Sequence, residues 1–161
     1  MRAVAVLTAI IFLAACGGVV YLYKTAELTA TDVRMTAIPA TEDPEKFNEI
    51  SRQIAGGGGL GILFSDEAPE NAEDWQFITY TVHLKNATFL TADAVEIQIT
   101  PMAGDVLQLA DETVWTLPAR SEGDLKVTLM TSSRMHGIRE MTVRWYMNGQ
   151  PFSLKTRATG V

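Results

Sequence analysis

The sequence predicts a mainly β protein: an antiparallel β-sandwich of seven to nine strands, preceded by an N-terminal membrane helix and one short amphipathic helix. Three observations lead to this prediction. Residues 3–23 are uncharged and apolar. From Trp75 onward, short segments alternate apolar and polar residues with the period of two that is typical of half-buried strands. The pair Asn148-Gly149 separates the last two such segments, and Asn-Gly is the preferred sequence of a two-residue hairpin turn.

The apolar segment is long enough to cross a membrane. Ala3 to Tyr23 is a run of 21 residues without a charge, and at about 1.5 Å per residue such a helix spans a hydrocarbon layer of roughly 30 Å. We therefore expect residues 1–24 to form an anchor that contacts membrane lipid through residues 3–23, and residues 25–161 to form one domain. Arg2 and the terminal amine favour a cytoplasmic N-terminus, which places the domain outside the cytoplasmic membrane, in the periplasm or at the cell surface.

A second interpretation of the same segment rests on its cysteine. The run Leu13-Ala14-Ala15-Cys16-Gly17 resembles the lipobox of bacterial lipoproteins, which implies cleavage before Cys16 and lipid on its thiol. The chain stays apolar after Cys16 through Tyr23, where lipoproteins turn polar, and this favours an uncleaved helix. Both alternatives leave the domain outside the membrane.

Composition argues against several classes of function. The net charge is −6, and phosphate binding requires clustered lysine and arginine, so we expect no nucleic acid partner. The only cysteine lies in the anchor, so the domain has no disulfide. A catalytic serine needs a base within reach, but His83 and His136 accompany no Gly-x-Ser-x-Gly sequence. We expect no catalytic residues, no cofactor and no enzymatic activity.

The first part of the domain predicts a strand and a helix. Residues 28–38 alternate loosely, and Pro39 closes this strand. Asp43 followed by Pro44 is the pattern of a helix N-cap and first helical position. Apolar residues then recur at spacings of three and four, which predicts an amphipathic helix of about three turns. These residues are Phe47, Ile50 and Ile54.

Residues 39–74 form an insertion that a sandwich does not require. Gly56–Gly59 ends the helix, Leu60–Phe64 predicts a short strand, and residues 65–74 form a polar loop with five acidic residues. The acidic spacing does not match a calcium-binding EF-hand loop, and the glycine run lacks the lysine of a phosphate loop. Two roles stay open for the insertion: it covers an exposed sheet edge, or it binds a partner.

The strand pattern is clearest from Trp75. Apolar residues occupy the even positions of residues 78–84, and the odd positions are polar. Further strands are expected at residues 95–99, 106–109, 114–117 and 125–129. Asn86-Ala87-Thr88 also has the acceptor pattern for N-glycosylation.

The last two strands are predicted with their register. A two-residue turn at Asn148-Gly149 places apolar side chains opposite one another on one face, so turn chemistry and hydrophobic pattern agree. Pro151 cannot donate a ladder hydrogen bond, which indicates that the last strand lies at a sheet edge. The predicted pairs are Met147–Gln150, Trp145–Phe152, Val143–Leu154 and Arg144–Ser153.

The stretch from about Trp75 to Lys155 resembles the immunoglobulin-like and fibronectin-type domains of bacterial surface proteins. The resemblance rests on the strand from Tyr80 to Asn86 and on residues 116–123, where a proline, a small residue and a polar turn lead into an alternating strand. The cysteine pair that joins the sheets of antibody domains is missing. The resemblance therefore implies architecture only, because this fold hosts many unrelated functions.

Two hypotheses on function follow. The anchor and the fold favour a non-catalytic module that binds another envelope protein or a surface polymer. The alternative is an envelope factor for copper handling or complex assembly, because thioether and imidazole groups suit Cu(I). Its candidate ligands are Met135 and His136, which are adjacent in a loop. Met141 and Met147 share the phase of core residues, so we expect no metal site.

Overall fold

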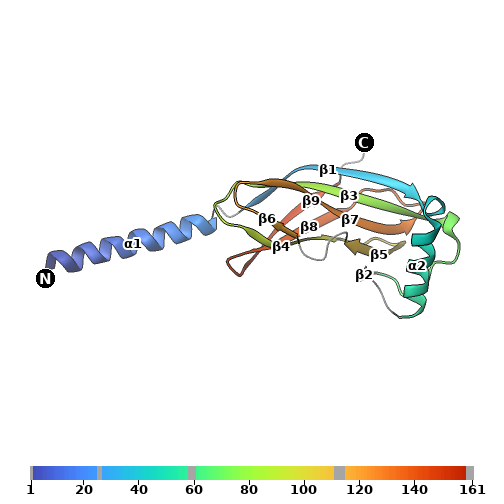
Figure 1. The fold of residues 1–161 in the computed structure, drawn as a ribbon, viewed down its shortest axis with the longest axis horizontal. Coiled ribbons are helices and arrows are strands. Elements are labelled where there is room, and N and C mark those ends of the chain that lie inside the picture. Colours follow the sequence, from blue (N-terminus) through green and yellow to red (C-terminus); the bar gives the residue numbers. More distant parts are fainter. Residues whose placement is uncertain (1, 25–26, 58–60, 111–114, 159–161) are drawn as a thin grey trace.

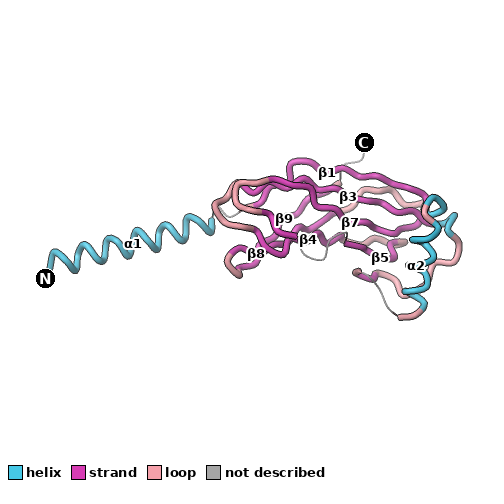
Figure 2. Tube along the Cα trace, viewed as in Figure 1, coloured by secondary structure: helices cyan, strands magenta, loops and turns pink. Residues whose placement is uncertain are grey.

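The computed structural model describes residues 2–24, 27–57, 61–110 and 115–158 (Figures 1 and 2). Two helices and two single 3-10 turns precede or interrupt the strands: α1 (Arg2–Lys24), α2 (Pro44–Ala55), Ala40–Glu42 and Ala72–Asp74. The strands are β1 (Leu28–Pro39), β2 (Ile62–Leu63), β3 (Trp75–Asn86), β4 (Ala92–Ile99), β5 (Asp105–Ala110), β6 (Trp115–Leu117), β7 (Glu122–Ser132), β8 (Glu140–Met147) and β9 (Gln150–Arg157).

The nine strands of the described residues form two antiparallel sheets, as the alternating pattern predicts. The first sheet has the order β1-β3-β7-β5-β2, and the second has the order β6-β4-β8-β9. Leu60 and Val114, which the sequence placed in strands, lie outside the described residues; their neighbours form the short strands β2 and β6. The fold class predicted from the sequence is therefore confirmed as a mainly β, antiparallel sandwich.

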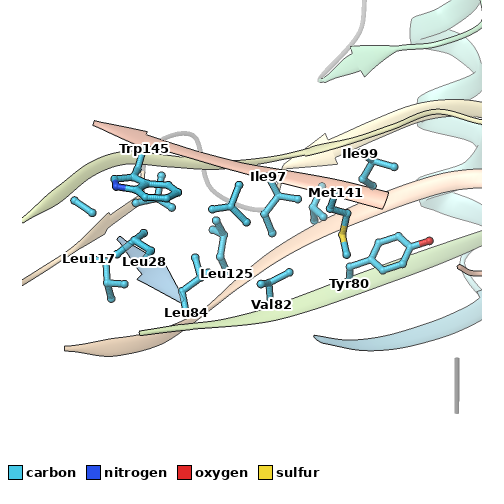
Figure 3. Close-up of a cluster of buried hydrophobic side chains, with 14 of the residues drawn as sticks. Leu28, Tyr80, Val82, Leu84, Ile97, Ile99, Leu117, Leu125, Met141 and Trp145 are labelled. Carbon is cyan, nitrogen blue, oxygen red and sulfur yellow. The ribbon is translucent and has the colours of Figure 1, made fainter. Parts of the chain in front are cut away.

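The core lies between the two sheets. Alternate residues of β3 and β7 face alternate residues of β4 and β8, and Figure 3 shows these side chains meeting in one layer. Burying a large apolar side chain stabilises the fold by about 1.5–3 kcal/mol, so this core is the main source of stability in a domain that has no disulfide. Met141 and Met147 belong to this core, as their phase predicts.

The C-terminal hairpin has the predicted register. All four predicted pairs, including Trp145–Phe152, occur between β8 and β9, and the two aromatic rings stack with centroids 5.9 Å apart. Asn148 and Gly149 both have positive φ, 49° and 75°, as a type I′ turn requires. β9 is an edge strand, which confirms the prediction from Pro151.

Helix α1 projects from one end of the sandwich (Figure 1). Its segment Val4–Tyr21 has a mean hydropathy of 2.4 and none of it is buried against the rest of the protein. Cys16 is exposed on this helix. The structure thus contains an apolar helix with the length and composition of a membrane anchor or a signal sequence, and its sidedness stays a prediction.

A second, smaller core lies on the outer face of the first sheet. Phe77 of β3 and Met130 of β7 point away from the main core, and α2 packs on them with Phe47, Ile50 and Ile54. The short strand β2 pairs with β5. The insertion therefore covers part of a sheet face with its helix and adds a strand beside β5.

A fully buried ion pair joins β5 to the loop before β8. Arg139 donates from Nε to Oδ2 of Asp105 at 3.0 Å and from Nη2 to Oδ1 at 2.7 Å, and neither side chain is exposed. A register shift at Val106 leaves Asp105 opposite Thr131 and Leu107 opposite Met130. This β-bulge turns Asp105 inward, on the same side as the inner face of the sheet.

Other hydrogen bonds complete this buried pair. Nη1 of Arg139 donates to the carbonyl oxygens of His136 and Ile138 at 2.7 and 2.9 Å, and the backbone amide of Met102 donates to Asp105. Burial lowers the pKa of Arg139. The hydrogen bond to Asp105 and the charge of that carboxylate together raise this pKa by a larger amount, so the net shift is upward. The guanidinium therefore stays charged inside the protein.

We expect Asp105→Ala to lower the free energy of unfolding by about 3–5 kcal/mol, because it leaves a buried arginine without its counter-ion. Urea denaturation of the domain measures the change. Asp32→Ala is the matched control: Asp32 pairs with Arg34, but the two side chains are 48% and 71% exposed, so we expect little change in the free energy of unfolding. A double variant, Asp105→Leu with Arg139→Met, is expected to be more stable than Asp105→Ala. If Asp105→Ala is as stable as Asp32→Ala, the buried pair does not have this role.

Tyr80 gives the domain a defined response to alkaline pH. Its hydroxyl donates to the carbonyl oxygen of Gly137 at 2.6 Å, and burial raises its pKa from 10.0 to about 12. Between these values the unfolded chain loses the phenolic proton while the folded protein keeps it, so the free energy of unfolding falls as pH rises. Tyr80→Phe is expected to lower the free energy of unfolding by about 0.5–1.5 kcal/mol at neutral pH. Between pH 10 and pH 12, the free energy of unfolding of this variant is expected to fall less steeply than that of the natural protein. Urea denaturation of both proteins across this range tests the expectation, and parallel curves contradict it.

Candidate functional site

The insertion lies at the end of the sandwich opposite α1 (Figure 1). Residues 39–74 contain nine acidic and two basic side chains, whereas the rest of the chain contains ten acidic and eleven basic ones. The net negative charge of the protein therefore comes from this one segment. The acidic residues are Glu42, Asp43, Glu45, Glu49, Asp66, Glu67, Glu70, Glu73 and Asp74.

Local sequence explains how the segment is held in place. Asp43 caps α2, since its Oδ1 accepts a hydrogen bond from the backbone amide of Lys46 at 3.1 Å, and Pro44 occupies the first helical position. Both features match the sequence prediction. Beyond the helix, Gly61 lies so close to β5 that a Cβ atom would overlap the carbonyl oxygen of Gln108. Only glycine allows β2 to approach β5 at this position.

A groove runs between the start of α2 and the acidic loop. Its volume is about 520 Å³, and a neighbouring depression of about 270 Å³ shares Glu70, Asn71 and Asp74 with it. We call these two together the distal groove. One wall comes from Thr41, in the 3-10 turn before α2, and from Pro44, Phe47 and Asn48 of α2. The other wall comes from the loop, through residues 65–74.

Most of the nine carboxylates of residues 39–74 are available to a partner, and those of Glu67, Glu70, Glu73 and Asp74 line the distal groove. Eight of the nine are exposed, and Asp43 is half-buried as the helix cap. Within the described residues, none of the nine forms an ion pair with lysine, arginine or histidine. The nearby Lys46 instead lies over the ring of Phe77, with Nζ 5.0 Å from the centroid. The groove thus presents an uncompensated negative surface, which attracts cationic partners.

No described group of three histidine, cysteine, aspartate or glutamate side chains has the arrangement of a metal site. His136 is exposed, and its carbonyl oxygen accepts from Arg139. Met135 is half-buried beside Gly104 and Ser132. The copper hypothesis stays a prediction without a structural observation in its favour.

His83 pairs with carboxylates rather than with a serine. Its Nδ1 lies 2.6 Å from Oδ1 of Asp124, and its Nε2 lies 3.9 Å from Oε2 of Glu122. These contacts lie on the outer face of the first sheet, where the sequence placed His83. They form a partly exposed cluster of polar contacts, and such surface contacts contribute little to stability.

The sequence did not reveal the two most elaborate polar arrangements. Asp105 and Arg139 are 34 residues apart, and the bulge that turns Asp105 inward breaks the alternation from which faces are read. Asn86 is also buried, and its amide donates to three carbonyl oxygens. The side chain of this N-glycosylation pattern is therefore inaccessible in the folded protein. For the distal groove, the sequence contains one indication, which is the excess of acidic over basic residues in the segment 39–74.

The fold and the site define an antiparallel β-sandwich that has an apolar helix at one end and an acidic groove at the other. No family model matches the chain, and no curated protein matches it. Among solved structures, the chain is similar to a FixG-related protein from Vibrio parahaemolyticus. The two share 12% sequence identity with a TM-score of 0.34, over 78% of this chain and 93% of the other. A likeness at this level carries no argument about function.

We expect the cap of α2 to hold the distal groove in shape. Asp43→Ala removes the acceptor for the Lys46 amide and is expected to lower the free energy of unfolding by about 1 kcal/mol. Asp43→Asn keeps an acceptor oxygen and is the matched control, with a change near zero. Urea denaturation measures both, and hydrogen exchange of the first turn of α2 shows where protection is lost. If Asp43→Ala and Asp43→Asn have equal free energies of unfolding, the Asp43 side chain does not stabilise α2 as a cap.

Proposed function

We propose that this protein is a membrane-anchored, non-catalytic binding module of a bacterial envelope, with its domain outside the cytoplasmic membrane. The observation that carries the proposal is the apolar helix α1, which is not buried against the domain. A helix with this hydropathy is unfavourable in water and favourable in a bilayer. The resemblance of the sequence to immunoglobulin-like and fibronectin-type domains of bacterial surface proteins supports this assignment.

The distal groove is the proposed partner-binding surface. The elements that line it, α2 and the loop before β3, lie at the end of the domain farthest from α1 (Figure 1), so a bilayer around α1 leaves the groove accessible. Its carboxylates are exposed and have no counter-ion among the described cations. We infer that the partner is a protein or surface polymer with a basic patch, because charge complementarity speeds association and selects the partner.

An uncleaved α1 is the form of the anchor that we propose. The helix continues through Cys16 to Lys24 without interruption, and its apolar character extends beyond the cysteine. The lipidated alternative places the cleavage site inside this helix. Mass spectrometry of the protein extracted from membranes separates the two forms, since one retains the N-terminal residues and the other begins at an acylated Cys16.

Crosslinking in intact cells, followed by identification of the partner, tests the proposal. A triple variant, Glu70→Lys with Glu73→Lys and Asp74→Lys, is expected to reduce crosslinking at least tenfold, because it reverses the charge of one wall of the groove. Asp93→Lys with Glu96→Lys is the matched control, since these exposed residues lie on β4, away from the groove. The control is expected to crosslink as the natural protein does.

The binding is also expected to weaken as salt concentration rises, because exposed charges are screened. If the triple variant and the control crosslink equally, the distal groove is not the partner-binding surface. Recovery of the native protein in the cytosol, with its N-terminus intact, overturns the anchored location.

A further inference from the structure

An exposed aromatic side chain lies at the end of the sandwich nearest α1. Phe89, in the loop between β3 and β4, is 67% exposed, which is the largest value for a large apolar side chain among the described domain residues. The guanidinium of Arg120 lies over its ring, 4.1 Å from the centroid. Tyr146, on β8 near the hairpin turn, is 47% exposed at the same end.

Buried hydrogen bonds hold the loop that carries Phe89. The Asn86 amide donates to the carbonyl oxygens of Leu90, Leu117 and Pro118 at 2.8, 3.2 and 3.0 Å. Its Oδ1 accepts from the backbone amide and the hydroxyl of Thr88, at 3.0 and 2.7 Å. Phe89 therefore projects from a loop whose buried neighbours are fully bonded. A buried polar network of this kind fixes the conformation of the loop around it.

The same network places Arg120 beside Phe89. The backbone amide of Arg120 donates to the carbonyl oxygen of Thr88 at 3.1 Å, and the backbone amide of Asn86 donates to the carbonyl oxygen of Ser121 at 2.8 Å. Arg120 has a φ of 56°, a left-handed conformation that costs free energy for a residue with a side chain. The turn thus holds Arg120 over the exposed ring of Phe89, although the left-handed backbone conformation costs free energy.

Chain connectivity places this pair near the membrane. Leu28, the first residue of β1, pairs with Asn86, the last residue of β3. Only three residues separate α1, which ends at Lys24, from Leu28, and four extended steps span at most about 14 Å. Phe89 follows Asn86 by three positions. If α1 crosses a bilayer, the end that carries Phe89 and Arg120 lies within reach of the lipid headgroups.

We propose that Phe89 and Arg120 form a contact with the bilayer surface that orients the domain on its anchor. This proposal rests on the proposed function, because it requires α1 to be in the membrane. Aromatic rings favour the headgroup level of a bilayer, and a guanidinium binds phosphate through charge-assisted hydrogen bonds. The guanidinium of Arg120 lies against the Phe89 ring and donates no side-chain hydrogen bond to a described residue, so its N–H groups can bind a lipid phosphate. The contact directs the distal groove away from the membrane.

The bilayer is the occupant that the short connection favours. A protein partner at this end has to fit within the same distance of about 14 Å that separates the end of α1 from β1. An anchored α1 also keeps Phe89 and Arg120 at a high effective concentration of lipid, so a weak contact is sufficient to orient the domain. Lys24 and Arg120 add positive charge that an anionic lipid surface attracts.

Depth-dependent fluorescence quenching tests the contact in the full chain. A Cys16→Ser background receives a single cysteine by Ala119→Cys, which carries an environment-sensitive fluorophore next to Arg120. A second protein receives Thr41→Cys in the distal groove instead; both positions are exposed. Each is reconstituted in vesicles of phosphatidylcholine and phosphatidylglycerol that contain a lipid with a headgroup nitroxide. We expect strong quenching at position 119 and none above background at position 41.

Substitutions identify the side chains responsible. Phe89→Ser is expected to reduce quenching at position 119, and Arg120→Glu is expected to lower the ratio of docked to undocked domain at least about fivefold. Met102→Ser is the matched control, because Met102 is 42% exposed at the opposite end, and it is expected to leave quenching unchanged. Quenching that survives both Phe89→Ser and Arg120→Glu overturns the proposal.

Flotation of the same vesicles separates this proposal from the proposed function. If the chain floats with the vesicles but positions 119 and 41 are quenched equally, the contact is wrong while the anchor stands. If the chain does not float, the anchor and the contact both fail. If position 119 is shielded from a soluble reagent in cells but not quenched in vesicles, a protein covers this end and the bilayer contact is wrong.

Discussion

Burial of apolar side chains between two sheets is the interaction on which the rest of this structure depends. The domain contains no cysteine, so neither sheet is tied to the other by a covalent bond. The inner faces of β3, β7, β4 and β8 supply nearly all of the large core (Figure 3). Because this core is continuous along the sandwich, its two ends are held at a fixed separation. One end then adjoins α1 and the other carries the insertion.

Polar groups inside this apolar layer determine how each end is closed. At the end distant from α1, Asp105 and Arg139 neutralise one another, and Tyr80 bonds to the loop that contains Arg139. Between the sheets, Gln108 of β5 bonds to the backbone of Ile97 and Ile99 in β4. At the end near α1, Asn86 satisfies the carbonyl groups of two loops. Unpaired polar groups are costly in an apolar interior, so each of these networks favours a single loop arrangement.

The two ends therefore present different chemistry. The distal end has carboxylates that pair with no described lysine, arginine or histidine, and the end near α1 has an aromatic ring and a guanidinium. The module that we propose, anchored at one end and bound to a partner at the other, needs this separation, because a bilayer blocks access to the surface beside it. The small core under α2 connects the distal groove rigidly to the first sheet through Phe77 and Met130, so the position of the groove follows from the position of the sandwich.

The sequence by itself determined the features that depend on neighbouring residues. The Asn148-Gly149 turn, the register of β8 and β9, the Asp43 cap and the apolar length of α1 each follow from a few consecutive side chains and their backbone preferences. Tertiary structure decided the features that join distant segments: the bulge at Val106, the pairing of Asp105 with Arg139, the burial of Asn86, and the meeting of α2 with the acidic loop. Their partners lie far apart along the chain, so no local preference encodes the contact. It forms only when the packed core brings the segments together and excludes water from the groups between them.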